Sequence, residues 1–391
     1  MTARPEGRIR IDLSASGGKG RARIENTRPL SLANQFSGRR PGEVASLVPL
    51  VFSICRAAQS AACAGALERA LPAPVCPREI ATRMLLTLGE TAREHALQVL
   101  HSWPQCLRAA EPAMASASIK QLLKIDRELT HCLAGASRLG AFDKTEALRA
   151  ISGLTALLGE AVYGELPSEW LSRQDFEELA SWAQRNETPA QTVTGYLIQS
   201  GMADAGAADI DPLPPLQPDK LEATLFGDGA RAFIAQPEWE GRPRETTPLS
   251  RVAETRLAVA VKDRCGTGLL ARLVACLIEL AGLPDRMLAL TRTLSEVPEE
   301  ALAPAAANAT GTGSGTAEAA RGRLVHAVDI EDGLVRRYRI LAPTEWNFHP
   351  EGAAARGLAA IALSAPSRRE VLARLFITAV DPCVGYDLRL S

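Results

Sequence analysis

Cysteine is the residue type in this sequence with the clearest potential for metal chemistry. There are eight cysteines, and no two have the spacing Cys-x-x-Cys, so the paired thiols of a zinc ribbon or a thioredoxin-type motif are absent. Most of them are expected to be buried thiols that pack as small apolar groups. Cys383 is different, because Pro382 restrains the backbone just before it. A rigidly held thiol could be a ligand, although its position alone does not distinguish a ligand from a packed side chain.

Two β-hairpins are expected near the ends of the chain. Residues 1–30 are predicted to form one, because apolar and polar side chains alternate from Ile9 to Leu13 and a glycine-rich turn follows. Residues 321–342 are predicted to form the other, because apolar side chains alternate on both sides of an Asp-Gly turn.

Most of the chain between the hairpins is predicted to be helical. Residues 44–203 place apolar side chains at three- and four-residue spacing, most clearly along 77–103. A long, mostly helical segment is expected over 248–283, ending at Gly282 ahead of a proline. Residues 366–391 are predicted to form a final helix and an Asp-Pro-Cys tail. The expected fold is therefore mainly α, with small β-hairpins near both chain ends.

Two stretches are predicted to be exposed linkers within a single unit that spans 1–391. Residues 204–220 are rich in proline and carry little apolar periodicity. Residues 303–320 consist mostly of Ala, Gly, Thr and Ser without periodicity, so a flexible linker is expected there.

Composition excludes several classes of function. Lys and Arg total 44 against 45 for Asp and Glu, so the chain lacks the surplus of cations with which nucleic-acid-binding proteins neutralise phosphates. No stretch is long and apolar enough to span a bilayer, and no secretory signal is visible. Because the cysteines do not form a dense disulfide framework either, a cytoplasmic protein is predicted.

Several short motifs occur in the order found in the large subunits of nickel-iron hydrogenases, and the chain resembles that family on this basis. The C-terminal motifs are similar to the family's Arg-Gly…Pro-Thr-Thr-Trp-Asn and to the start of its Asp-Pro-Cys-x-x-Cys-x-x-His. No single motif would suffice, and the ordered set implies a reduced large-subunit fold. The matching segments are Arg4–Arg8, Cys55–Ala62, Glu90–His101, Glu240–Arg251, Arg321–Asn347 and Asp381–Cys383.

The chain departs from this family at the metal ligands. In the family, two Cys-x-x-Cys pairs hold nickel and iron, and the second cysteine of each pair bridges the two metals. Cys55 and Cys383 match the first positions, whereas Ala58 and Tyr386 stand at the bridging positions. Neither alanine nor a neutral tyrosine replaces a soft thiolate. The resemblance therefore implies Cys55 and Cys383 as metal ligands, no nickel, and no hydrogenase catalysis.

The residues that surround the iron's diatomic ligands in the family look retained. There the iron carries two cyanides and one carbon monoxide, and an arginine and a threonine each donate to one cyanide. Arg321 and Thr344 match these two residues, and Ala342 and Pro343 would line the wall of the site. A guanidinium offers charge-assisted hydrogen bonds to a partly negative cyanide nitrogen. These four residues are therefore the candidates for binding an Fe(CN)2(CO) unit, although Arg321 could instead cap the hairpin and face solvent.

This combination resembles the large-subunit-like accessory proteins of hydrogenase maturation, of the HupK/HoxV type. The resemblance implies a non-catalytic scaffold or chaperone that binds Fe(CN)2(CO) transiently and transfers it to the hydrogenase large subunit. The large subunit and small maturation chaperones would be its transient partners. Two alternatives stay open: a divergent hydrogenase catalytic subunit with an altered centre, and a metal-free interaction protein of the maturation complex.

Overall fold

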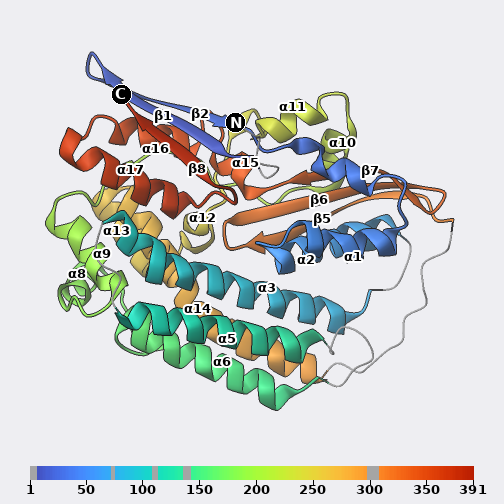
Figure 1. The fold of residues 1–391 in the computed structure, drawn as a ribbon, viewed down its shortest axis with the longest axis horizontal. Coiled ribbons are helices and arrows are strands. Elements are labelled where there is room, and N and C mark those ends of the chain that lie inside the picture. The colour runs from blue at the N-terminus through green and yellow to red at the C-terminus, as the bar shows by residue number, and fades with distance from the viewer. Residues whose placement is uncertain (1–6, 72–74, 108–112, 135–141, 297–307) are drawn as a thin grey trace.

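The computed structural model describes residues 7–71, 75–107, 113–134, 142–296 and 308–391, so the first part of the Arg4–Arg8 motif lies outside the described residues. The fold is mainly helical, as predicted, with three small sheets (Figure 1). The helices are α1 (Pro41–Val51), α2 (Arg56–Ala70), α3 (Pro77–Leu97), α4 (Trp103–Cys106), α5 (Ala113–Ala134), α6 (Lys144–Leu158), α7 (Pro167–Trp170), α8 (Phe176–Gln184), α9 (Pro189–Gln199), α10 (Pro218–Phe226), α11 (Ala230–Ala235), α12 (Pro248–Val252), α13 (Arg256–Cys265), α14 (Leu269–Glu296), α15 (Pro343–Asn347), α16 (Ala353–Ile361) and α17 (Pro366–Val380). The strands are β1 (Ile9–Ser16), β2 (Lys19–Asn26), β3 (Glu238–Trp239), β4 (Arg242–Pro243), β5 (Gly311–Ala319), β6 (Gly322–Glu331), β7 (Leu334–Leu341) and β8 (Tyr386–Leu390).

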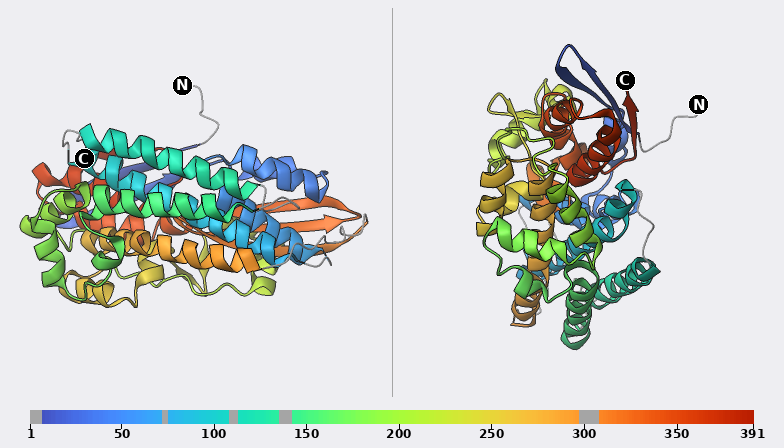
Figure 2. Two further views of the ribbon diagram at one scale, coloured as in Figure 1. Left: turned by 90° about the horizontal axis from the view of Figure 1, so that it is seen from below. Right: turned by 90° about the vertical axis from the view of Figure 1, so that its left-hand side faces the viewer.

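Four long helices form the largest layer. Helix α3 packs on α14 and α5, and α6 packs on α5 and α14, so the four run along the long axis of the molecule with the β5–β7 sheet at one end (Figure 2). Apolar side chains from all four helices form the main core. None of the described helices combines the length and the apolar character needed to cross a bilayer.

The first sheet joins the two ends of the described chain. Strands β1 and β2 form the predicted N-terminal hairpin, with Ile9 opposite Asn26. Strand β8 adds to the other edge of β1 in parallel, with Ile9 also opposite Tyr386. This third strand was not predicted, because its partner strand lies at the opposite end of the sequence.

The second sheet contains the other predicted hairpin. Strands β6 and β7 pair across a turn in which Asp332 and Gly333 both have positive φ, as a two-residue hairpin turn requires. On the other edge of β6, β5 forms where the sequence analysis expected a flexible linker over 303–320, so that prediction was wrong for residues 311–319.

Close packing explains why β5 has the composition of a linker. Three alternate glycines of β5 face α2, and a Cβ at Gly313 would lie 2.4 Å from the Ala66 carbonyl oxygen. A Cβ at Gly315 would lie 2.3 Å from the Ala62 carbonyl oxygen. The small residues of this segment therefore allow a helix and a strand to approach each other closely.

Two other predicted boundaries also differ from the structure. Residues 204–217 are irregular and mostly exposed or partly exposed, as predicted, but the segment is anchored, because the backbone N–H of Leu213 donates to the Glu245 carbonyl and the Leu213 side chain is buried. Residues 218–220 belong to α10 rather than to the linker. The predicted helical segment 248–283 is three helices, and α14 continues through Gly282 to Glu296. It continues because its apolar side chains remain buried beyond that glycine.

Candidate functional site

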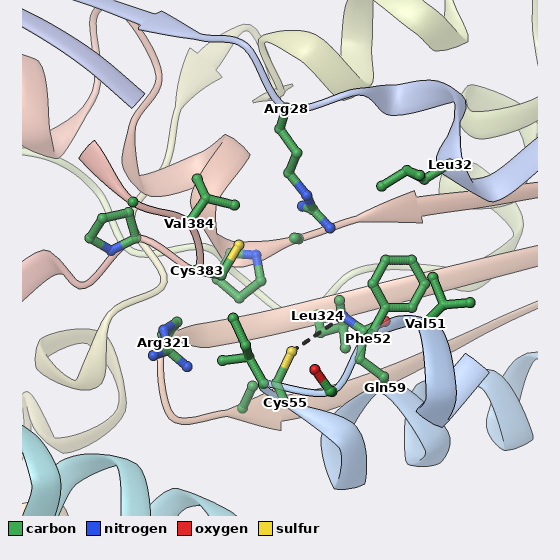
Figure 3. Close-up of a pocket in the computed structure, with 17 residues that line it drawn as sticks. Arg28, Leu32, Val51, Phe52, Cys55, Gln59, Arg321, Leu324, Cys383 and Val384 are labelled. Carbon is green, nitrogen blue, oxygen red and sulfur yellow. Dashed lines mark hydrogen bonds between the residues drawn. The ribbon is translucent and has the colours of Figure 1, made fainter. Parts of the chain in front are cut away.

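The two candidate cysteine ligands line one cavity of about 360 Å³, close to the junction of the two larger sheets (Figure 3). Five chain segments meet there: the segment after β2, the connection from α1 to α2, the β5–β6 turn, the start of α15 and the segment before β8. The lining residues are Arg28, Leu32, Val51, Phe52, Ser53, Ile54, Cys55, Gln59, Ala319, Arg321, Leu324, Ala342, Pro343, Pro382, Cys383, Val384 and Gly385.

Cys55 immediately precedes α2, and the start of that helix is fixed by a buried carboxylate. Glu90 of α3 accepts hydrogen bonds from the backbone N–H groups of Ala57 at 2.8 Å and Ala58 at 3.1 Å, which satisfies two donors at the helix N-terminus. Burial raises the pKa of the Cys55 thiol to about 11, and the neighbouring Cys383 contributes in the same direction. Cys55 is therefore a protonated thiol near neutral pH when no cation is bound to it.

A chain of hydrogen bonds leads from Cys55 into the core. Gln59 Nε2 donates to Cys55 Sγ at 3.4 Å, and Gln59 Oε1 lies 2.7 Å from His326 Nε2. His326 Nδ1 lies 2.6 Å from the Tyr338 hydroxyl. Burial, together with Arg28, lowers the pKa of His326 to about 3, so the ring is neutral. Because Gln59 Oε1 can only accept, we assign the ring proton to Nε2. His326 is therefore a fully buried, hydrogen-bonded histidine of the core.

Cys383 lies between α17 and β8 and is held by Thr344 of α15. The Thr344 hydroxyl donates to Cys383 Sγ at 3.0 Å and accepts from the Cys383 backbone N–H at 3.1 Å. Thr344 is buried, and its contact with the site is made through Cys383. The other candidate cofactor-binding residues, Arg321, Ala342 and Pro343, line the cavity directly.

Arg321 occupies the β5–β6 turn and lies between two acidic side chains, with 12% of its side chain exposed. Its Nη2 lies 2.9 Å from Glu94 Oε2, and its Nε lies 2.9 Å from Asp381 Oδ2. The second pair is close enough for an ion pair but is poorly aligned, because neither atom makes a hydrogen bond in the described part of the chain. Burial disfavours the charge on Arg321, but Asp381 and Glu94 more than offset this and raise its pKa. The alternative in which Arg321 faces solvent is therefore excluded.

A second arginine, which was not predicted from the sequence, also lines the cavity. Arg28 follows β2 and points into the cavity, where its Nη1 lies 3.1 Å and 3.3 Å from the two carboxylate oxygens of Glu345. Glu345 stands where the hydrogenase motif has its second threonine. A buried carboxylate needs a cationic partner, so this departure was the signal that could have led to Arg28.

Neither position of the missing bridging cysteines lines the cavity. Ala58 is fully buried in α2 against Ala317 and Ala319 of β5. Tyr386 lies on β8 and lines a separate cavity with Cys106 and Arg374. Burial raises the pKa of Tyr386, so its phenol stays protonated. Tyr386 therefore does not plug or enter the cysteine cavity.

The donor set restricts what the cavity could hold. Among the described residues, no group of three or more His, Cys, Asp or Glu side chains is arranged to hold a metal ion. The two thiols of Cys55 and Cys383 are fewer than the ligands that a structural zinc site requires. They suit a metal unit that brings further ligands of its own, and soft thiolates suit iron among such metals.

The chain is similar to several known proteins along most of its length. A family model described as nickel-dependent hydrogenase matches residues 255–385. The chain is 32% identical over 386 residues to the hydrogenase expression/formation protein HoxV of Cupriavidus necator, covering 94% of this chain and 92% of HoxV. It is 30% identical over 396 residues to the hydrogenase expression/formation protein HupV of Azotobacter chroococcum mcd 1, covering 98% of each.

The fold is similar to that of solved hydrogenases. The reduced Ni-Fe-Se hydrogenase from D. vulgaris Hildenborough matches with a TM-score of 0.68 at 17% identity, over 94% of each chain. This confirms the predicted large-subunit fold. On the strength of the near-full-length sequence matches, the chain belongs to the hydrogenase expression/formation proteins that include HoxV, HupV and HupK.

Proposed function

We propose that this protein is a non-catalytic scaffold of hydrogenase maturation that binds an Fe(CN)2(CO) unit as cargo and passes it to a hydrogenase large subunit. The observation that supports this most directly is the composition of the cavity: two thiols, two largely buried arginines and no further metal ligand among the described residues. Relatives over almost the full chain are named hydrogenase expression/formation proteins, which supports a role in assembly rather than in turnover.

The ligand count fits this cargo. The unit brings three diatomic ligands, and the thiolates of Cys55 and Cys383 would add two more. Each cysteine would lose its thiol proton on binding, because the thiolate is the metal ligand. The raised pKa of Cys55 therefore makes proton loss part of loading.

Arg321 and Thr344 are the proposed contacts to the cyanides. Arg321 is already held in place by Glu94, so it would not need to be ordered when cargo arrives. The Thr344 hydroxyl donates to Cys383 Sγ without cargo, so contact with a cyanide would exchange one acceptor for another. Small maturation chaperones and the large subunit are the proposed transient partners.

The absence of bridging thiols argues against a nickel centre. Ala58 offers no donor atom, and Tyr386 lies in another cavity. We therefore propose that the scaffold carries iron without nickel.

Infrared spectroscopy combined with metal analysis tests the proposal. Protein purified without oxygen from a host that expresses the maturation machinery should show cyanide and carbonyl stretching bands, stoichiometric iron and no nickel. Cys55→Ala and Cys383→Ala should lose the bands and the iron. Cys265→Ala is the matched control, because Cys265 is also a partly exposed thiol but lies in α13.

Three results would contradict the proposal. Folded wild-type protein without iron or bands would favour a metal-free interaction protein. Retention of the bands in both cysteine variants would remove Cys55 and Cys383 as ligands. Nickel together with hydrogen uptake would favour a divergent catalytic subunit.

A further inference from the structure

Arg28 brings a second guanidinium into the cysteine cavity. It enters from the segment after β2, whereas Cys55 enters from the start of α2, and Figure 3 shows its guanidinium pointing toward the space beside Cys383 and Cys55. Its side chain is only 12% exposed. Arg28 and Arg321 therefore approach this cavity from separate parts of the fold.

Glu345 fixes the orientation of Arg28. Its carboxylate binds Arg28 Nη1 through both oxygens. The same carboxylate accepts a hydrogen bond from the Ala342 backbone N–H at 2.8 Å, and Asn26 Nδ2 lies 3.5 Å from it. Because Glu345 is itself almost fully buried, with 1% of its side chain exposed, it has little freedom to move.

This arrangement leaves part of the guanidinium available. Within the described chain, the hydrogen bonds of the Arg28 side chain all involve Nη1, so Nη2 and Nε keep their hydrogens for other acceptors. Burial disfavours the charge on Arg28, but Glu345, then Cys383 and Cys55, raise its pKa. The charge is therefore permanent and lies close enough to both sulfurs to interact with them.

We propose that Arg28, positioned by Glu345, is a second anion-recognising residue of the cavity and donates a hydrogen bond from Nη2 to a cyanide of the bound iron unit. This inference rests on the proposed function for the identity of the anion. The free Nη2 group and the cavity do not depend on that function. Two guanidiniums from separate segments would favour an iron unit with anionic diatomic ligands over a bare iron ion.

The first test compares infrared spectra and iron content of the loaded protein. In Arg28→Gln, one cyanide band should shift, and affinity for the unit should fall about tenfold, as expected for loss of one charge-assisted hydrogen bond. Arg28→Lys keeps the positive charge but loses the planar guanidinium. Its affinity for the iron unit should therefore lie between those of Arg28→Gln and the wild type. Glu345→Gln should also shift the band, because Arg28 loses its anchor. Arg10→Gln is the control, since Arg10 lies on β1 in an exposed ion pair with Glu25.

The second test needs no cargo. Cys383 is alkylated with anionic iodoacetate and with neutral iodoacetamide, and the two rates are compared by peptide mapping. Both reagents attack the same thiolate, so any change in thiol ionisation cancels in the ratio. Arg28→Gln should lower the iodoacetate-to-iodoacetamide ratio about fivefold or more through loss of one nearby charge, whereas Arg10→Gln should not.

The two tests separate the inference from the proposed function. A loaded wild-type protein whose cyanide bands are unchanged by Arg28→Gln overturns the contact with cargo but leaves the scaffold intact. An unchanged alkylation ratio overturns anion recognition by Arg28. A wild-type protein without cyanide bands removes the proposed function, and a lowered ratio would then still support Arg28 as an anion-recognising residue.

Discussion

One hydroxyl group holds Cys383 at two points: Thr344 Oγ1 donates to the thiol at 3.0 Å and accepts from the backbone N–H of the same residue at 3.1 Å. Thr344 belongs to the first turn of α15, whereas Cys383 follows α17. The pair therefore ties the segment after the second hairpin to the tail that carries the candidate ligand.

Removing this hydroxyl should destabilise the tail. We expect Thr344→Val to lower the free energy of unfolding by about 1–2 kcal/mol, because the partly buried N–H of Cys383 loses its acceptor. Thr344→Ser keeps the hydroxyl and should lower the free energy of unfolding by less. Denaturant unfolding followed by circular dichroism checks this, and a Val variant as stable as wild type would show that the two hydrogen bonds contribute little.

A buried ionic cluster in the helical core predicts a pH dependence of stability. Glu279 of α14 lies 2.9 Å from His95 Nε2 and accepts from Arg251 Nε at 2.7 Å. Burial opposes protonation of His95, but Cys276 and Glu279 more than offset it and raise the pKa of His95 from 6.5 to about 10. A proton bound more tightly in the folded state stabilises the fold below pH 6.5, and this stabilisation is lost as the pH rises toward about 10.

Replacing the histidine should remove this dependence. In His95→Gln, the free energy of unfolding should fall less between pH 6.5 and 10 than in wild type. His131→Gln is the control, because His131 is exposed on α5. If the free energy of unfolding changed equally with pH in wild type and His95→Gln, the raised pKa of His95 would be contradicted.

The contact between α2 and β5 should tolerate no added side chain. A Cβ at Gly313 would meet backbone atoms of Ala66 and Ala70 at 2.4 Å, so Gly313→Ala must push the helix and strand apart. We expect a loss of about 1–3 kcal/mol in the free energy of unfolding. Because Cys55 immediately precedes α2, iron retention should fall as well. Gly42→Ala is the control, since no atom lies within 4 Å of an added Cβ there.

Restoring a cysteine at the C-terminal bridging position should not restore nickel binding. Tyr386 faces a cavity that it shares with Cys106 and Arg374, so the thiol in Tyr386→Cys would be directed there. We expect iron content and infrared bands like those of wild type, and no nickel by metal analysis. Stoichiometric nickel in this variant would show that β8 can rearrange.

Local patterns in the sequence predicted the elements whose structure is determined by residues close together in the chain. The alternation from Ile9 to Leu13 and the Asp-Gly turn at 332–333 define both hairpins, because period-two patterning and positive φ are local properties. The final helix, predicted within 366–391, is α17. The two cavity cysteines were identified only through resemblance to a family, since no local pattern links Cys55 to Cys383.

The features that were not predicted from the sequence depend on tertiary contacts. The glycines of β5 resemble those of a linker until α2 is placed against them. Strand β8 is defined by its pairing with β1, which lies at the other end of the chain. Arg28 and Glu94 became part of the site only when their partners Glu345 and Arg321 were located.

The positions of the two cysteines imply that cargo binding would also stabilise the fold. Cys55 immediately precedes α2, whereas Cys383 lies shortly before β8, the strand that completes the first sheet. An iron unit bound by both sulfurs would act as a removable cross-link between distant parts of the chain. Loading would then restrict the unfolded chain and add binding free energy to the fold. The melting temperature of the whole protein would therefore report whether the scaffold is loaded or empty.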